Sequence, residues 1–164
     1  MQGKRGQKRF ALRAKAVVLA SDHAGFALKE ALKGFLAGKG FSVEDRGPKI
    51  YDKDDDYPDF VIPAAQRVAS LGAKGIFIGK TGQGEAFAAN KVKGVRAVVY
   101  YCNNHQIIKF SREHNDANVL SIGGEFVTGS DAKRAALLWL TSGFTKAERH
   151  VRRLRKIARY ESRH

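Results

Sequence analysis

The segment GIFIGKTGQGEAFAANK, residues 75–91, decides the fold class, because it joins a strand to a helix through a glycine-rich turn. Its first four residues are an apolar run, which is typical of a strand buried on both faces. The turn at residues 79–84 contains three glycines, and the residues that follow it, up to Lys91, are mostly good helix formers. A strand that leads through a tight turn into a helix is the basic unit of an α/β protein.

The same alternation occupies the rest of the chain. Nearly continuous apolar strands that alternate with longer amphipathic segments predict a parallel sheet with helices on both faces. We therefore expect a Rossmann-like, three-layer α/β/α sandwich around a five-stranded parallel sheet. The other strands are expected at residues 15–20, 41–45, 95–100 and 118–122, and helices at about 26–37, 60–70, 103–113, 131–141 and 145–160, with an acidic loop at 50–59.

Length and composition favour one domain. The 164 residues are 43% hydrophobic, which is enough to bury a core, and no repeat or linker divides them. We assign residues 15–164 to a single domain that ends in a basic helix, and residues 1–14 to a flexible basic tail. The chain contains no apolar signal run, no stretch of 18 apolar residues and only one cysteine, Cys102. These features predict a cytoplasmic protein without a membrane span or an intrachain disulfide.

The formal net charge of +14 comes mainly from the two ends. Residues 1–15 contain six Lys or Arg and no acid, and residues 145–164 contain eight basic residues against Glu148 and Glu161. Basic ends can bind nucleic acid or an anionic surface. A solvated tail and one basic helix explain them as well, and nucleic-acid binding leaves the middle of the chain unexplained. We therefore do not expect nucleic acid as a partner.

Ligands of open parallel sheets bind outside the carboxyl ends of the strands. This rule selects SDHAG at residues 21–25, the glycine turn, and the loops after the fourth and fifth strands. The letters GKT at residues 79–81 suggest a P-loop, but that motif needs a glycine five residues earlier, where this chain has Lys74. A dinucleotide fingerprint is also absent after the first strand, so both nucleotide motifs are disfavoured.

The glycine turn is better explained as a cradle for an anion or an oxyanion. Gly82 and Gly84 allow backbone N–H groups to approach a ligand, and the following helix contributes its positive end. Thr81 adds a hydroxyl donor, and Glu85 adds a carboxylate in the first turn of that helix. Glu85 alone could equally be an exposed acid that complements the helix dipole.

Five strings, taken together and in order, resemble the family of type B ribose-5-phosphate isomerases and the related galactose-6-phosphate isomerase subunits. The resemblance covers about residues 15–160. It implies an α/β/α sandwich, no metal or other cofactor, and a homodimer, or a tetramer built on it, with active sites at the subunit interface. The strings are SDHAG (21–25), YDKDDDYPDF (51–60), TGQGEAFAANKVKGVRA (81–97), HNDANVLSIGG (114–124) and ERHVRR (148–153).

The resemblance also assigns the base. Many members carry a catalytic cysteine at the end of the third strand, where this chain has Gly79. A second branch lacks that cysteine and uses a glutamate in a G-S-G-N-G-E turn, which TGQGE at residues 81–85 matches. By this match Glu85 moves the proton between C1 and C2 through an enediolate, while the glycine turn and Thr81 stabilise the developing oxyanion. Cys102 lies on another strand end and is expected to be an inert, packed thiol.

Opening of the sugar ring needs an acid and a base. The resemblance assigns this step to Asp22 and to His114 with Asn115, the latter pair coming from the partner subunit. His23 and Tyr57 match substrate-contacting positions. Asp22 could otherwise be a helix N-cap, and His114 could cap carbonyls at a helix C-terminus.

The phosphate needs fixed cations. Arg149 and Arg153 are four residues apart, hence on one helix face, and match the phosphate-binding pair of the family. Arginine suits a phosphate because its planar fork donates paired hydrogen bonds. The alternative is a solvated basic face, which better describes Arg152, Arg155 and Arg159.

Two positions depart from the family pattern. Glu125 stands where an arginine usually helps to bind phosphate, and Lys80 stands where a glycine is usual. Lys80 could offset Glu125 or replace the lost cation. We expect an aldose–ketose isomerase of ribose 5-phosphate and ribulose 5-phosphate. The alternatives are an isomerase of another sugar phosphate, such as a hexose 6-phosphate or a modified sugar, and a non-catalytic homologue that binds sugar phosphate or nucleic acid.

Overall fold

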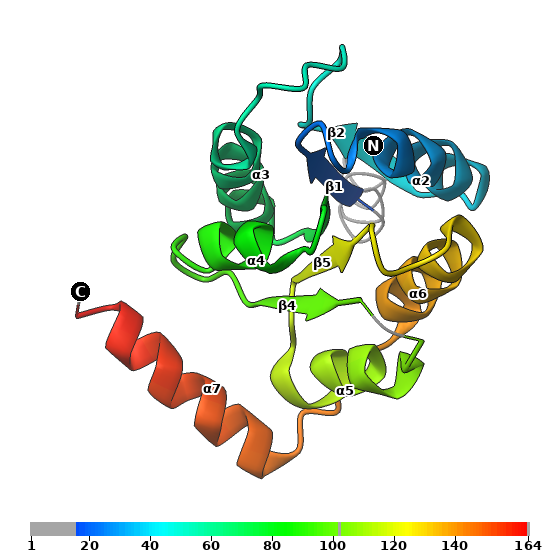
Figure 1. The fold of residues 1–164 in the computed structure, drawn as a ribbon. Coiled ribbons are helices and arrows are strands. Elements are labelled where there is room, and N and C mark those ends of the chain that lie inside the picture. The colour runs from blue at the N-terminus through cyan, green and yellow to red at the C-terminus, as the bar shows by residue number, and fades with distance from the viewer. Residues whose placement is uncertain (1–15, 102, 164) are drawn as a thin grey trace, which may run out of the picture.

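The structure, a computed structural model, describes residues 16–101 and 103–163. The basic tail assigned to residues 1–14 and the thiol of Cys102 therefore lie outside the described residues. Within them, strands and helices alternate as the sequence predicts (Figure 1).

The sheet has five parallel strands in the order β2-β1-β3-β5-β4. Leu19 pairs with Ile76, and Ile76 pairs with Leu120, so the three central strands are in register. These strands are apolar almost throughout because helices cover both faces. The strands are β1 (Ala16–Ser21), β2 (Ser42–Asp45), β3 (Lys74–Gly79), β4 (Ala97–Tyr100) and β5 (Val119–Gly123).

The helices form the two outer layers. Helices α3 and α4 pack on one face of the sheet, and α2, α5 and α6 pack on the other (Figure 1). This arrangement confirms the predicted three-layer α/β/α sandwich. The helices are α2 (Phe26–Gly38), α3 (Tyr57–Leu71), α4 (Gln83–Ala89), α5 (His105–Asn115), α6 (Gly129–Thr141) and α7 (Glu148–Glu161).

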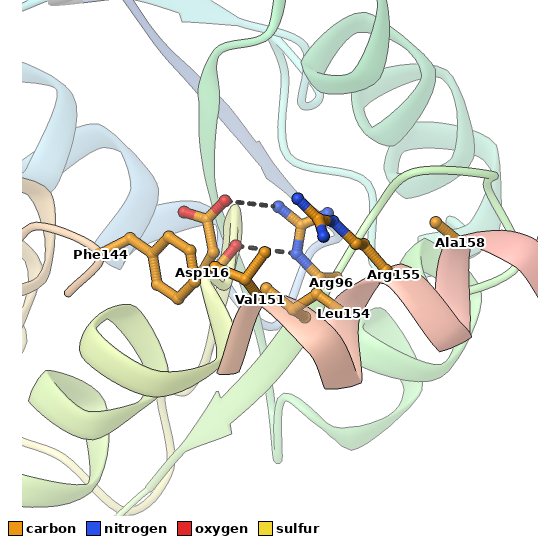
Figure 2. Close-up of a pocket in the computed structure, with 7 residues that line it drawn as sticks. All are labelled: Arg96, Asp116, Phe144, Val151, Leu154, Arg155 and Ala158. Carbon is orange, nitrogen blue, oxygen red and sulfur yellow. Dashed lines mark hydrogen bonds and ion pairs between the residues drawn. The ribbon is translucent and has the colours of Figure 1, made fainter. Parts of the chain in front are cut away.

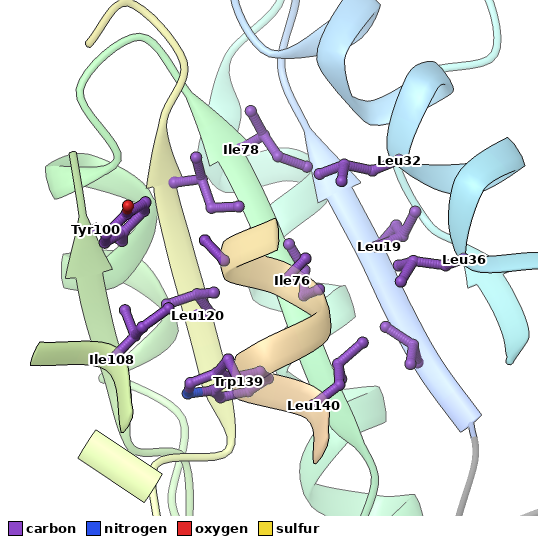
Figure 3. Packing of buried hydrophobic residues seen from close by; sticks show 14 of the residues in the cluster. Leu19, Leu32, Leu36, Ile76, Ile78, Tyr100, Ile108, Leu120, Trp139 and Leu140 are labelled. Carbon is purple, nitrogen blue, oxygen red and sulfur yellow. The ribbon is translucent and has the colours of Figure 1, made fainter. Parts of the chain in front are cut away.

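The larger of the two cores lies under α2, α5 and α6 (Figure 3). Trp139 of α6 is fully buried against the strands, and its indole N–H donates to Ser111 Oγ at 3.2 Å. Burial of side chains of this size contributes about 1.5–3 kcal/mol each, so this core is the main anchor of the sheet.

Element ends differ from the prediction by a few residues. Helix α3 already begins at Tyr57, inside the expected acidic loop, because Pro58 fits the first turn of a helix. Helix α7 begins at Glu148 rather than near residue 145. Thr145 is held outside it, since its N–H and hydroxyl both donate to the carbonyl of Glu113.

Helix α7 is the basic C-terminal helix that the sequence predicts, and it extends away from the sandwich (Figure 1). It lies beside the end of α5. Across residues 16–101 and 103–163, no helix combines the length and the apolar content that crossing a membrane requires.

Candidate active site

The carboxyl ends of β1, β3 and β5 bring three turns side by side. Ser21 pairs with Ile78, and Gly79 pairs with Gly123, so the strands end at nearly the same level. The turns that follow them carry SDHAG, the glycine turn and residues 123–126. The structure therefore places the first half of the predicted site at one edge of the sheet.

Backbone hydrogen bonds fasten the glycine turn to the end of β5. The carbonyl of Gly79 accepts from the N–H of Gly124 at 2.9 Å, and the carbonyl of Gly82 accepts from the buried hydroxyl of Ser121 at 2.6 Å. Gly82 has a φ of 73°, a left-handed conformation that favours glycine. Thr81 Oγ1 accepts from the N–H of Gln83 at 3.3 Å, which fixes the hydroxyl at the start of α4. The turn is thus a preorganised cradle.

Glu85 points back into the sheet edge. Its side chain comes from the first turn of α4 and is only 4% exposed. A Cβ atom built on Gly79 would overlap the Glu85 carboxylate, so this carboxylate fills the space that a side chain at position 79 would need. Burial raises the pKa of Glu85, and the nearby charge of Asp22 raises it further, against a backbone hydrogen bond that lowers it. A carboxylate with a raised pKa is a stronger base.

Asp22 has a structural task as well as a place in the site. One carboxylate oxygen, Oδ1, accepts from the N–H groups of Ala24 at 3.0 Å and Gly25 at 3.2 Å. These bonds shape the turn before α2, but the N-cap of that helix is Gly25 without a side-chain cap, so the alternative that Asp22 is a helix N-cap is wrong. The residue is 7% exposed, and its charge is close enough to act on Glu85. The second oxygen, Oδ2, lies 4.0 Å from Nδ1 of His23.

His23 is held by a residue that the sequence did not single out. Asp55 Oδ1 lies 2.7 Å from Nδ1 of His23 and accepts from the backbone N–H of His23 at 2.9 Å. The only sequence signal for Asp55 was its place in the acidic run at residues 52–56.

Tyr57 lies against the glycine turn. A Cβ atom on Gly84 would come within 2.8 Å of the Tyr57 ring, so the absence of a side chain at Gly84 lets this ring pack on the turn. The role of the Gly84 backbone N–H at the substrate stays a prediction.

Asp22, His23 and Asp55 also form a group whose ligand atoms lie within 4.8 Å of one another. Such a trio could hold a metal ion only if the direct bond between His23 and Asp55 opened. We therefore treat the trio as a hydrogen-bonded unit.

The second half of the predicted site lies elsewhere. His114 and Asn115 end α5, a few residues before β5 begins, and so lie at the amino edge of the sheet. A strand of five residues spans about 16 Å. Arg149 and Arg153 lie on α7 and are exposed. Within one chain, these four residues are not brought to Glu85.

An aromatic stack joins α5 to α7. The ring of His114 lies between Phe110, at 4.7 Å, and His150, at 4.5 Å, with 13° between the ring planes in each pair. His150 is 5% exposed, and desolvation followed by the charges of His114, Arg149 and Arg153 lowers its pKa. His150 was visible in the string ERHVRR but received no role from the sequence.

Two grooves separate α7 from the end of the sheet. One, of about 260 Å³, is lined by residues of both charges and by apolar residues of α7 (Figure 2). At its base Arg96 donates to the carbonyl of Asp116 at 2.9 Å and to its carboxylate at 3.1 Å. The neighbouring groove measures about 360 Å³ and includes Asn115 and Ile157. Helix α7 therefore packs incompletely on its own chain.

The two departures from the family pattern are neighbours. The N–H of Glu125 donates to the carbonyl of Lys80 at 3.1 Å, and both side chains are exposed beside the glycine turn. This contact confirms the predicted nearness of the two residues. Pairing of their side chains stays a prediction.

Comparisons with known proteins point to one family. A family model described as Ribose/Galactose Isomerase matches residues 17–157. Ribose-5-phosphate isomerase B of Mycobacterium tuberculosis is 42% identical over 149 residues, which cover 90% of this chain and 91% of that protein. The crystal structure of ribose-5-phosphate isomerase B from Mycoplasma genitalium with bound ribulose-5-phosphate is 40% identical, with a TM-score of 0.84 over 90% of this chain and 96% of that chain. The type B enzyme of Trypanosoma cruzi, 35% identical, gives a TM-score of 0.85 over 92% and 98% of the two chains.

Proposed function

The chain belongs to the ribose/galactose isomerase family, and on this premise we propose that it interconverts ribose 5-phosphate and ribulose 5-phosphate. Relatives that carry this activity in their names align over about nine tenths of the chain. The fold, the level of identity and the cradle at the carboxyl edge all support an aldose–ketose isomerase.

One observation carries the proposal for the base: the buried Glu85 carboxylate fills the space beside Gly79 at the end of β3. In the open-chain aldose, Glu85 takes the proton from C2 and returns it to C1 of the enediolate, while the proton of the C2 hydroxyl passes to the oxygen on C1. Its raised pKa brings its basicity closer to neutral pH, where proton transfer is most efficient. Backbone N–H groups of the turn and Thr81 stabilise the oxyanion.

In this proposal, the complete substrate site contains residues from two copies of the chain. Asp22 acts in ring opening, and His23 and Tyr57 contact the sugar. His114 and Asn115 of one chain complete the site of the other in a homodimer, and Arg149 and Arg153 bind the phosphate there. The distance of these four residues from Glu85 within one chain supports this arrangement.

Exposed apolar side chains also support a dimer. Phe87 of α4 is 66% exposed, and large apolar side chains of α5 and α7 are exposed as well. These are Ile107, Phe110 and Ile157. Apolar surface of this kind commonly marks a protein–protein contact.

A turnover assay tests the reaction. We expect the purified protein to convert ribose 5-phosphate to ribulose 5-phosphate faster than any other sugar in a panel of pentose and hexose phosphates. Glu85→Gln keeps the shape and should lower kcat by at least about 10³-fold with little change in KM. The matched control is Glu113→Gln on α5. Turnover of Glu85→Gln close to the unsubstituted level would exclude Glu85 as the base.

Mixed dimers test the shared site. At a ribose 5-phosphate concentration below the KM of the unsubstituted protein, a Glu85→Gln chain and an Arg149→Ala/Arg153→Ala chain should each be nearly inactive alone. When they are refolded together, half of the molecules become mixed dimers, and each of these regains one intact site. Recovery of about a quarter of the unsubstituted activity is expected, and no recovery would mean that each chain builds its own site.

Glu125 favours one second candidate, an isomerase of another sugar phosphate. A carboxylate beside the phosphate site disfavours a dianion unless a cation such as Lys80 compensates it. Preference for a hexose phosphate or a modified sugar in the same panel would select this candidate. A non-catalytic homologue that binds nucleic acid would instead show no turnover and a salt-dependent affinity for RNA or DNA. A cytoplasmic location stays a prediction from the sequence.

A further inference from the structure

The loop between β2 and α3 places one acidic side chain inside the site. Asp55 belongs to the run at residues 52–56, whose other members are exposed, yet the Asp55 side chain is only 8% exposed. Its oxygen Oδ2 is buried and has no hydrogen-bond partner among residues 16–101 and 103–163. A buried, half-satisfied carboxylate is costly, so its position needs an explanation.

We propose that Asp55 is a positioning residue, which fixes the ring of His23 so that Nε2 is the nitrogen offered to the substrate. The inference rests on the proposed function, because it takes the carboxyl-edge cradle as the sugar-phosphate site. Asp55 itself acts through His23 and does not touch the substrate.

Two hydrogen bonds from one oxygen carry the argument. Asp55 Oδ1 lies 2.7 Å from Nδ1 of His23 and accepts from the backbone N–H of the same residue at 2.9 Å. A carboxylate oxygen only accepts, so Nδ1 carries a hydrogen. The neutral ring is then the tautomer with a free acceptor at Nε2, and the protonated ring offers a donor there.

Aromatic packing restricts the ring further. Tyr51, in the same loop, meets His23 edge to face with 6.4 Å between ring centroids, and it meets Phe26 of α2 at 6.1 Å. The loop thus holds His23 by its backbone, by one ring nitrogen and by one ring face. The side chain remains 34% exposed, so it is not sealed off from a ligand.

The pairing also sets the charge of the ring. The hydrogen bond to Asp55 is the main cause that raises the pKa of His23, and the charges of Asp22 and Asp55 add to it, against a smaller effect of desolvation. The imidazolium therefore persists above pH 6.5 and is lost as pH rises through the raised pKa. A cation held at this position suits an anionic or hydroxyl oxygen of the substrate.

NMR titration of the histidines tests the inference without substrate. In the unsubstituted protein, the ¹⁵N shifts of His23 should show hydrogen on Nδ1, and its pKa should lie above 6.5. Asp55→Asn keeps the shape and an acceptor but removes the charge, so the pKa of His23 should fall. Asp54→Asn is the matched control, because Asp54 is an exposed neighbour whose side chain is 77% exposed.

Steady-state kinetics then distinguish a positioning role of Asp55 from a purely structural one. Asp55→Asn should raise KM for ribose 5-phosphate about tenfold at pH 7.5, which corresponds to ~1.4 kcal/mol, with kcat nearly unchanged because Glu85 is untouched. The pH at which KM begins to rise should move down with the pKa of His23. Asp54→Asn should change neither quantity.

The outcomes distinguish this inference from the proposed function. An Nε2–H tautomer in the unsubstituted protein, or a His23 pKa that Asp55→Asn leaves unchanged, overturns the role of Asp55 whatever the activity. Equal effects of Asp54→Asn and Asp55→Asn overturn it too. If the protein isomerises no sugar phosphate, the proposed function fails, and the NMR titration alone decides whether Asp55 orients His23.

Discussion

The carboxyl edge of the sheet and the corner between α5 and α7 carry the two halves of the predicted site, yet they are built differently. At the carboxyl edge, Glu85 and Asp22 are buried, and their positions are set by turns that backbone hydrogen bonds fasten together. At the corner, Arg149 and Arg153 are exposed on a helix that packs incompletely on its own chain. The first region is held in place within one chain, whereas the arginines of the second region are open to solvent in one chain.

This contrast suits two different tasks, proton transfer at the carboxyl edge and phosphate binding at the corner. Proton transfer needs a base placed within tenths of an ångström, and a preorganised edge provides that. Binding of a phosphate needs charge and hydrogen-bond donors, which an exposed helix can deliver to a neighbouring chain. Substitutions that remove or displace Glu85 should therefore lower kcat, and substitutions at the corner should raise KM.

After the removal of the Glu85 carboxylate itself, the largest effect is expected from Gly79→Ala at the carboxyl edge. The new methyl group would overlap the Glu85 carboxylate and displace the base, and a displacement of about 1 Å can cost roughly 10²-fold in rate. Steady-state kinetics should show the loss in kcat. Gly34→Ala in α2, where nothing lies within 4 Å of the new methyl group, is the control and should keep full turnover. Equal kcat for both variants would mean that Glu85 can move without consequence.

A smaller effect is expected at the corner. Arg149→Ala and Arg153→Ala each remove one charge-assisted contact to the phosphate, worth about 1.5–3 kcal/mol, so KM should rise roughly 10- to 100-fold with kcat preserved. Arg159→Ala serves as the control because it is exposed on the same helix without an assigned contact. A similar rise in KM for all three variants would indicate a diffuse positive field instead of a site.

A double-mutant cycle tests whether the side chains of Lys80 and Glu125, beside the glycine turn, interact. Their backbones are hydrogen-bonded, but both side chains are exposed, so a coupling of about 0.2–1 kcal/mol in kcat/KM is expected. Lys80→Gly with Glu125→Arg restores the usual family residues and should retain or improve activity on ribose 5-phosphate. Strictly additive effects would show that the two side chains do not interact.

The smallest effect concerns the stack between α5 and α7. The pKa of His150 is lowered from 6.5 in the folded chain, so folding opposes its protonation. The contribution of His150 to the free energy of unfolding is therefore complete above pH 6.5, and it decreases as pH falls below that value. Urea unfolding between pH 5 and pH 8 should show a steeper acid-side loss in the unsubstituted protein than in His150→Gln. If the free energy of unfolding changes with pH in the same way in both proteins, the pKa of His150 is not lowered by folding.

Most of the fold follows from local patterns that the sequence displays. The run at residues 75–78 is apolar throughout and ends in glycines, so both its burial and the turn after it could be predicted. The helix starts were less certain, because Tyr57 and Pro58 lie at the end of an acidic loop and only the local geometry shows that they already begin α3. Element ends depend on single hydrogen bonds, such as those of Thr145, which a pattern of apolar residues does not report.

The candidate site was predictable in its parts and less so in its arrangement. Glu85 could be selected from the turn that carries it, but its overlap with the space beside Gly79 depends on how α4 meets β3. Asp55 was hidden among four other charged residues at 52–56, because only the path of the loop decides which of them turns inward. The sequence likewise singled out Gly84 and Tyr57 separately, and only the packing shows that the Tyr57 ring lies against Gly84.

The shared space at the end of β3 also restricts how the protein can change over generations. A side chain at position 79 would meet the Glu85 carboxylate, which would have to shift to admit it, so the fitness effect of a substitution at either position depends on the residue at the other. If Glu85 is the base, natural selection should accept a larger residue at position 79 only where the carboxylate can move aside or is no longer needed. The two positions are therefore expected to evolve together.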